Sequence, residues 1–132
     1  MKKILICGLG SIGQRHLRQI KSIKNSSFEI CALRSRKIDF IISDNLVDSV
    51  KGSPEEYYKI NVFYNIQEAL EWKPDAVFVT NPISMHVSTA LRMAENGSHI
   101  FIEKPLDSST KEVSLLKNLV KEKKLVCMIG YQ

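Results

Sequence analysis

The chain has 132 residues, of which 44% are apolar and 25% are charged, an ordinary globular composition with enough length to bury one core. The net charge of +5 comes from 19 lysines and arginines against 14 acids, but the basic residues are dispersed, which argues against a nucleic-acid or membrane-surface partner. No run of transmembrane length occurs, and the apolar run after Lys2-Lys3 is broken by Gly8 and Gly10 before it reaches the length of a secretory signal.

The first predicted strand is the apolar run Ile4-Leu5-Ile6-Cys7, which leads directly into the turn Gly8-Leu9-Gly10-Ser11-Ile12-Gly13. Apolar residues then recur at nearly helical spacing, at Ile12, Leu17, Ile20 and Ile23. A strand, a G-x-G-x-x-G turn and a helix in this order are typical of a dinucleotide-binding turn.

The three glycines of this turn have different tasks in such a site. We expect Gly8 to permit the tight turn, Gly10 to let the backbone approach a pyrophosphate, and Gly13 to allow close packing of the helix on the strand. The pyrophosphate would sit on the first N–H groups of the helix, those of Ser11 and Ile12 among them.

Residues 28–33 read as a second strand, and 62–64 as a short third one. Between them, residues 35–60 combine the apolar Phe40-Ile41-Ile42 with the punctuation of Gly52-Ser53-Pro54, and we predict a helical or irregular excursion there.

The remainder alternates regularly between helix and strand. Asn65 is predicted to cap a short helix that ends before Pro74, and Ser84 is predicted to cap a longer one, with Gly97 just past its end. Ser109 and Glu112 form a candidate capping box for the last helix. The predicted strands of this part are 76–79, 100–102 and 125–129.

Repeated β and α units of this kind predict an α/β fold. We expect a doubly wound parallel sheet of about six strands in a three-layer αβα arrangement, with residues 1–132 forming one domain. Its ligand site would lie at the carboxyl ends of the strands.

The three cysteines, Cys7, Cys31 and Cys127, each fall within a predicted strand. They show neither CxxC nor Cys/His spacing, which argues against a metal site or a disulfide. The pattern predicts buried, reduced thiols in a cytoplasmic protein.

The tail of the second strand bears on the choice of cofactor. Roughly 20 residues after the glycines, an NAD site presents an acid to the ribose hydroxyls, and no acid occupies that place here. Arg34, Ser35 and Arg36 offer guanidinium groups and a hydroxyl instead, which match a 2′-phosphate. This tripeptide favours NADP over NAD.

Two further segments follow the fourth and fifth strands, Thr80-Asn81-Pro82 running on to His86, and Glu103-Lys104-Pro105. Together with the glycine turn, in order and approximate spacing, they resemble the amino-terminal domain of the glucose-fructose oxidoreductase, inositol dehydrogenase and MocA family. The resemblance covers the whole chain apart from residues 37–60.

The resemblance implies a Rossmann-type domain of an NAD(P)-dependent oxidoreductase that transfers hydride to or from a sugar, cyclitol or related polyol-like substrate. Lys104 would be the catalytic lysine, because an ammonium group near the reacting oxygen stabilises alkoxide character and helps to relay its proton. Glu103 would orient this lysine or line the cofactor pocket. Asn81 and Pro82 would lie along the cofactor, with Thr80 a weaker candidate.

The histidines and the chain end carry weaker expectations. His86 either donates to a ribose or substrate oxygen or serves packing, and these two readings stay open. His16 is read as a packing residue or one that supports the site, whereas His99 has no case for function. The resemblance implies that Tyr131-Gln132 approaches the nicotinamide end.

The family's substrate-binding domain, with its acid/base histidine, has no counterpart in these 132 residues. We therefore expect the chain to bind NADP with little turnover of substrate, and to expose an apolar face that favours self-association. The alternative from another class is a non-catalytic dinucleotide-binding or sensor module acting through a partner. A methyltransferase that uses a similar glycine turn for S-adenosylmethionine is weakened by Glu103-Lys104-Pro105.

Overall fold

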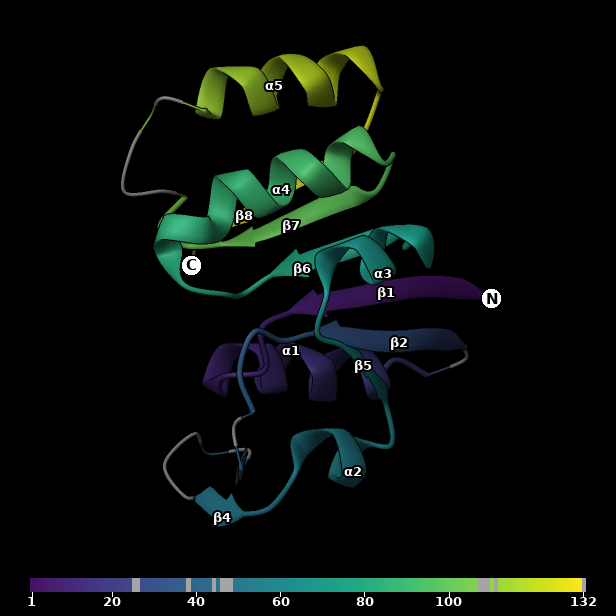
Figure 1. Ribbon diagram of the computed structural model, residues 1–132, viewed down its shortest axis with the longest axis vertical. Coiled ribbons are helices and arrows are strands. Elements are labelled where there is room, and N and C mark those ends of the chain that lie inside the picture. Colours follow the sequence, from purple (N-terminus) through teal and green to yellow (C-terminus); the bar gives the residue numbers. More distant parts are fainter. Residues whose placement is uncertain are drawn as a thin grey trace.

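The computed structural model describes residues 1–24, 27–37, 39–43, 45, 49–106, 110 and 112–131. A six-stranded parallel sheet, with strands in the order β5-β2-β1-β6-β7-β8, runs through it (Figure 1). This confirms the predicted doubly wound sheet. Its strands are β1 Lys2–Cys7, β2 Phe28–Leu33, β5 Asn61–Phe63, β6 Ala76–Val79, β7 His99–Glu103 and β8 Cys127–Gly130.

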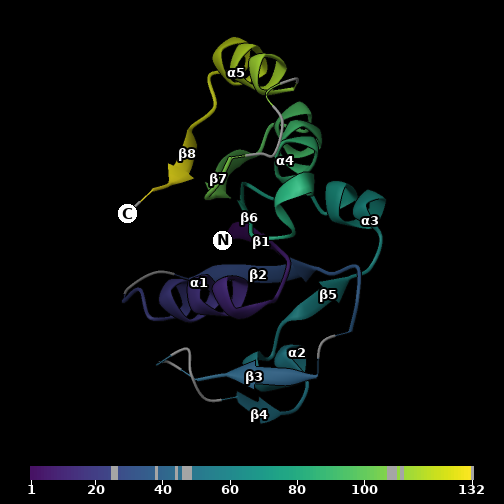
Figure 2. The same cartoon turned by 90° about the vertical axis from the view of Figure 1, so that its left-hand side faces the viewer.

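Helices pack on both faces of the sheet. α1 (Ser11–Lys21) covers one face, while α3 (Ile66–Glu71), α4 (His86–Glu95) and α5 (Val113–Glu122) lie on the other (Figure 2). Side chains alternate along a strand, so β1 contributes to two cores. One core joins Ile4 and Ile6 to α1, and the other joins Leu5 and Cys7 to α4; their buried members include Leu17, Ile20, Ala32, Val77, Val79, Val87, Ala90 and Met93.

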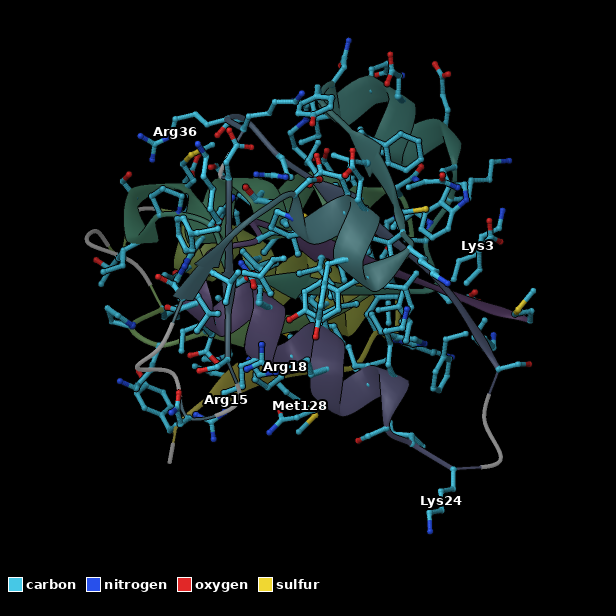
Figure 3. The ribbon with its side chains drawn as sticks, turned by 90° about the horizontal axis from the view of Figure 1, so that it is seen from below. Lys3, Arg15, Arg18, Lys24, Arg36 and Met128 are labelled. Carbon is cyan, nitrogen blue, oxygen red and sulfur yellow. The ribbon has the colours of Figure 1, made fainter. Side chains whose placement is uncertain are left out.

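The layer formed by α1 does not extend over the edge strand β8. Phe78, Phe101 and Met128 are register partners on adjacent strands, and Phe78 still packs against the core below α1. Met128, two strands further, is 58% exposed. In Figure 3, Met128 is labelled on the same lower side of the view as Arg15 of α1. The sheet thus has a partly uncovered apolar face at this edge.

The prediction for residues 35–60 is only partly right. A short helix, α2 (Pro54–Tyr58), is present, but β3 (Phe40–Ile42) and β4 (Ser49–Lys51) form an antiparallel two-stranded sheet that was not predicted. Strands of three residues are too short to show a period of two. They are held from outside, because Arg18 of α1 donates to the carbonyl of Ile42 at 2.8 Å.

Two of the predicted helix signals are confirmed and one is wrong. The side chain of Asn65 accepts a hydrogen bond from the Gln67 N–H at 2.8 Å, and Gly97 adopts a φ of 89° just after α4. Ser84 does not cap α4. It lies inside a 3₁₀ turn, η1 (Ile83–Met85), and α4 begins at His86 with no side-chain cap.

Element ends differ from the predictions by one or two residues, as is usual. α1 ends at Lys21, so Ile23 lies beyond it and is half-exposed. β5 begins one residue before the predicted 62–64, and β8 begins at Cys127 instead of 125. Ser109 of the predicted capping box falls outside the described residues, and Glu112 forms no side-chain cap on α5.

The order of the sheet determines where a ligand can lie. Connections run outward from β1 in one direction through β2 and β5, and in the other through β6, β7 and β8. The carboxyl ends of β1 and β6 therefore flank the point where the strand order reverses, which is where doubly wound sheets bind ligands. None of the helices in the described ranges has the length and apolar character needed to cross a membrane.

Candidate functional site

The glycine turn after β1 has the shape expected of it. Gly8 has a φ of 100°, and a Cβ atom on it would lie 2.9 Å from the Thr80 carbonyl oxygen. A Cβ on Gly13 would lie only 1.9 Å from the Gly8 carbonyl oxygen, so α1 packs directly against the turn. Around Gly10 the space is open, because none of the described residues apart from its chain neighbours has a heavy atom within 4 Å of the Cβ position. The turn is therefore crowded by the protein at Gly8 and Gly13 and open at Gly10.

The start of α1 leaves backbone donors available on this open side. Gly10 is its N-cap and forms no side-chain capping bond, and its first turn contains no acid. The first N–H groups of a helix lack partners within the helix, and its N-terminus carries a partial positive charge. Ser11, Ile12 and Gly13 therefore present N–H groups suited to an anion.

A cavity of about 570 Å³ opens beside this turn, at the carboxyl ends of β1, β2 and β6. Its charged lining residues are Arg34, Arg36 and Arg92, and among the residues that the structure describes no acid lines it. The size suits a cofactor site. Of the predicted site residues, it is lined by Gly8, Gly10, Arg34, Ser35, Arg36, Thr80, Asn81 and Pro82.

Thr80 joins the ends of β6 and β1. Its hydroxyl lies 2.8 Å from the Gly8 carbonyl oxygen and 3.0 Å from that of Cys7, and donates to them. Its backbone N–H also donates to Cys7, at 2.9 Å. Thr80 therefore holds the glycine turn against the neighbouring strand.

Asn81 has one satisfied and one unsatisfied polar atom. Its Nδ2 donates to the hydroxyl oxygen of Thr89 at 2.9 Å. Its Oδ1 is buried and accepts no hydrogen bond from any residue that the structure describes. Such atoms are rare in folded proteins. Since Asn81 lines the cavity, a ligand hydroxyl or amide could supply the donor.

His86 joins two loops of the site. The ring is 2% exposed; Nε2 lies 2.8 Å from the Asn81 carbonyl oxygen, and Nδ1 lies 2.9 Å from that of Pro105. Of the two roles left open by the sequence, this geometry matches that of a packing residue. His86 fixes the distance between the segments that follow β6 and β7.

Glu103 ends β7 and is held from two sides. Its Oε1 lies 2.7 Å from Nε2 of His16, and its Oε2 accepts the N–H of Lys104 at 3.2 Å. The His16 ring packs between Phe78 and Phe101, with centroid separations of 5.4 and 5.0 Å. His16 thus has the packing and supporting position expected of it, and Lys104 is exposed next to this cluster.

The other predicted residues have plain surroundings. His99 opens β7, and its Nδ1 accepts the N–H of Val126 at 3.0 Å, which is a structural role. Tyr131 is 69% exposed, and Gln132 lies outside the described residues. Cys7 and Cys31 are buried in their strands as predicted, but Cys127 is only partly buried, because it lies on the edge strand β8. Within the described ranges, no three His, Cys, Asp or Glu residues gather as metal ligands do.

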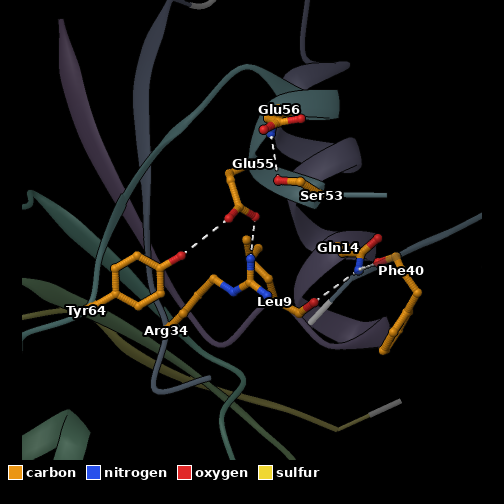
Figure 4. Close-up of polar contacts among 8 residues, drawn as sticks. All are labelled: Leu9, Gln14, Arg34, Phe40, Ser53, Glu55, Glu56 and Tyr64. Atoms are coloured by element: carbon orange, nitrogen blue, oxygen red, sulfur yellow. Dashed lines mark hydrogen bonds and ion pairs between the residues drawn. The ribbon is translucent and has the colours of Figure 1, made fainter. Parts of the chain in front are cut away.

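Arg34 differs from the exposed basic residue that the sequence suggested. Its side chain is 2% exposed and forms an ion pair with Glu55 of α2, whose other carboxylate oxygen accepts from the Tyr64 hydroxyl at 3.3 Å (Figure 4). An acid therefore does reach the end of β2, but it comes from a helix 21 residues further along the chain. Arg36, by contrast, is exposed.

Gln14 links the glycine turn to the β3–β4 sheet. It is fully buried in α1, and its Nε2 donates to the carbonyls of Leu9 and Phe40 at 3.0 and 3.1 Å (Figure 4). Its Oε1 accepts the Ile42 N–H at 2.9 Å. Sequence reasoning passed over it because a glutamine in a helix is usually exposed. Tyr64, Glu55 and Arg92 were missed too, since no local motif surrounds them.

Residues 2–131 match a family model for the NAD-binding Rossmann fold of an oxidoreductase family. The family takes its name from glucose-fructose oxidoreductase, inositol dehydrogenase and MocA. The chain belongs to this family. The resemblance read from the glycine turn and from Glu103-Lys104-Pro105 is thereby confirmed, and with it an NAD-binding oxidoreductase domain.

Two similar curated proteins are dehydrogenases. Scyllo-inositol 2-dehydrogenase (NAD(+)) of Bacillus subtilis is 40% identical over 57 residues, which is 43% of this chain and 17% of the relative. The 4-carboxy-2-hydroxymuconate-6-semialdehyde dehydrogenase of a Sphingobium species is 28% identical over 130 residues, 98% of this chain and 38% of the relative. The chain thus spans well under half the length of these relatives.

Solved structures of similar fold include scyllo-inositol dehydrogenase from Lactobacillus casei with bound NAD(H) and scyllo-inositol, at a TM-score of 0.76 and 20% identity. The match covers 98% of this chain and 36% of that one. UDP-N-acetylglucosamine 3-dehydrogenase from Acidithiobacillus ferrooxidans gives a TM-score of 0.75 at 22% identity, over 97% and 37% of the two chains. At these identities the likeness shows the fold alone.

Proposed function

We propose that residues 1–132 form the NADP-binding domain of a dehydrogenase that acts on a sugar, cyclitol or related polyol-like substrate. The observation that carries this proposal is the uncapped start of α1 beside the open space at Gly10, within a cavity that three arginines and no acid line. Backbone N–H groups and arginines are the groups that bind phosphates.

The residues present suit such a cofactor along its length. The N–H groups of Ser11, Ile12 and Gly13 would take the pyrophosphate, and Oδ1 of Asn81 would accept a hydrogen bond from a hydroxyl or amide of the cofactor. A 2′-phosphate would meet Ser35 and Arg36, the exposed residues of the β2 tail. This last contact is the basis for preferring NADP to NAD.

Lys104 is the residue that we assign to proton chemistry. A nicotinamide cofactor accepts or supplies the hydride when it is bound. The exposed Lys104 ammonium would stabilise negative charge on the substrate oxygen and move its proton. Glu103 positions this lysine by accepting a hydrogen bond from the backbone N–H of Lys104. His86 holds the segment after β7 through its contact with the Pro105 carbonyl.

The substrate class follows from relatives and not from this chain's own contacts. Inositol, nucleotide-sugar and semialdehyde dehydrogenases are among the similar proteins. Because the chain spans about a third of their length, we propose that the substrate is held mainly by residues outside it and that turnover by these 132 residues is low. The exposed Met128, Val126 and Tyr131 would favour self-association of the chain.

Titration of the chain with NADPH, NADH and S-adenosylmethionine tests the proposal. We expect NADPH to raise the melting temperature most, NADH to raise it less, and S-adenosylmethionine to leave it unchanged. If neither nicotinamide cofactor raised it, dinucleotide binding would be refuted. A rise with S-adenosylmethionine alone would favour the methyltransferase reading.

The cofactor preference has a separate test. Substituting Arg36→Ala should weaken NADPH binding about tenfold, since a charge-assisted contact to phosphate is lost, and change NADH binding less than about twofold. Lys37→Ala is the matched control, because Lys37 is the next residue, is exposed and does not line the cavity. Equal losses for both cofactors would refute a 2′-phosphate contact.

A further inference from the structure

We infer that Glu55 sets the limit of this site's selectivity for NADP over NAD, by offsetting the charge of Arg34 at the ribose end of the cavity. The inference rests on the proposed function and deepens it. It assigns different roles to the two arginines of the β2 tail. Arg36 binds the 2′-phosphate, while Arg34 and Glu55 form an ion pair with almost no net charge at the side of the cavity.

The geometry fixes both members of this pair. The backbone N–H of Arg34 donates to the Phe63 carbonyl at 3.0 Å, which extends the pairing of β2 with β5. Its side chain is 2% exposed and points to Glu55, whose side chain is 18% exposed. Glu55 stands in the first turn of α2, where Ser53 accepts the Glu56 N–H (Figure 4).

Glu55 is ionised in this setting. Burial raises its pKa, but its own backbone N–H, the Arg34 charge and the hydroxyls of Ser53 and Tyr64 lower it by more, so the pKa of Glu55 lies below its ordinary value. The pair therefore joins one positive to one negative charge at neutral pH.

The cavity presents only one side of the pair. Arg34 and Tyr64 line it, but Glu55 lies behind them and is not among the lining residues. A ligand phosphate would feel the Glu55 charge through the low-dielectric side chains in front of it, while a ribose hydroxyl, being neutral, would feel little. Glu55 therefore acts on NADP and hardly on NAD.

The substitution Glu55→Gln tests this directly in the full chain. It removes the negative charge and keeps an oxygen that can accept from Arg34 or Tyr64. We expect the ratio of NADPH to NADH affinity to rise about threefold to tenfold, because a dianionic phosphate gains most from the lost repulsion. Glu56→Gln, one residue along α2 and exposed, makes the same change in net charge and should move the ratio less than about twofold.

A second variant keeps the inference testable if Glu55→Gln does not fold. The double variant Arg34→Gln with Glu55→Gln removes both charges and leaves the net charge unchanged. If the charges of Arg34 and Glu55 cancel, the ratio of NADPH to NADH affinity should stay within about twofold of that of the unaltered chain. A fall of tenfold or more would show that Arg34 itself reads the phosphate, and would overturn the inference.

Two other outcomes have clear meanings. A Glu55→Gln variant that changes NADPH and NADH affinity equally, or that matches Glu56→Gln, overturns the role of Glu55 and leaves dinucleotide binding intact. An unaltered chain that binds neither cofactor overturns the proposed function itself. Titration by nucleotide fluorescence, with circular dichroism of each variant as the check of folding, separates these cases.

Discussion

Nε2 of His16 lies 2.7 Å from Oε1 of Glu103, although 87 positions separate the two residues in the chain. His16 belongs to the helix that follows the glycine turn, and Glu103 ends the strand that leads to Lys104. The contact therefore ties the predicted pyrophosphate site to the predicted catalytic lysine across the central strands. Both side chains are less than one-fifth exposed.

A double-mutant cycle measures how much the contact between His16 and Glu103 contributes to stability. His16→Ala, Glu103→Gln and the double variant should show a coupling free energy of about 1 kcal/mol in urea unfolding, the usual size for a partly buried hydrogen bond. The cycle removes the separate loss of packing between His16 and the rings of Phe78 and Phe101. A coupling below about 0.3 kcal/mol would show that the contact contributes no stability.

The glycines at positions 10 and 13 should respond in opposite ways to alanine. Gly13→Ala places a Cβ 1.9 Å from a backbone oxygen and should lower the free energy of unfolding by more than about 3 kcal/mol. Gly10→Ala meets nothing, so stability should change by less than about 1 kcal/mol. Cofactor affinity should nonetheless fall at least about tenfold. A Gly10→Ala chain with unchanged affinity would contradict the placement of the pyrophosphate.

Thr80 offers a test of how the glycine turn is held. Thr80→Val keeps the shape of the side chain but removes the donor that serves the carbonyls of Cys7 and Gly8. We expect a loss of about 1 to 2 kcal/mol in the free energy of unfolding. Thr80→Ser restores the hydroxyl and should recover most of it. A Thr80→Val variant as stable as the unaltered chain would contradict the role of the hydroxyl, and a loss confined to Thr80→Ser would point to packing of the methyl group.

The buried thiol of Cys7 makes stability depend on alkaline pH. Burial raises the pKa of Cys7 from 9.0 to about 12. Above pH 9 the unfolded chain loses this proton while the folded chain keeps it, so stability is present below pH 9 and falls as pH rises toward 12. Between pH 8 and 10 we expect Cys7 to account for a loss of about 1 to 1.5 kcal/mol.

Cys7→Ala isolates this contribution from other groups that titrate at high pH. The alanine variant starts less stable, because a buried side chain is truncated. Between pH 8 and 10, the free energy of unfolding of this variant should then fall by about 1 to 1.5 kcal/mol less than that of the unaltered chain. Parallel declines would mean that Cys7 ionises equally in both states.

The parallel sheet was predictable because its signals are local. Each strand is a short apolar run. The residues that begin or end the helices between these runs act on their immediate neighbours, as Asn65 does on Gln67 and as Gly97 does just after α4. The glycine turn is local in the same sense. Its motif lies within six residues, although Thr80, 72 positions after Gly8, also crowds the turn.

What the sequence could not show depends on partners far along the chain. The strands β3 and β4 have three residues each and are stabilised by Gln14 and Arg18 of α1, which no periodicity reveals. Arg34 looks like an exposed cation until Glu55 arrives from α2. Ser84 resembles a helix cap, but it lies inside the 3₁₀ turn, one residue before Met85, which is the N-cap of α4.

The position of β1 at the centre of the sheet has a consequence for the order of assembly. Its partner β2 follows closely in the chain, but its other partner, β6, joins Ile4 to Ala76 across more than half of the 132 residues. Closing so large a loop is slow relative to forming local pairs. A nascent chain that has reached only its first half therefore carries the glycine motif without the wall that completes it. Nucleotide binding would therefore report that β6 has joined β1.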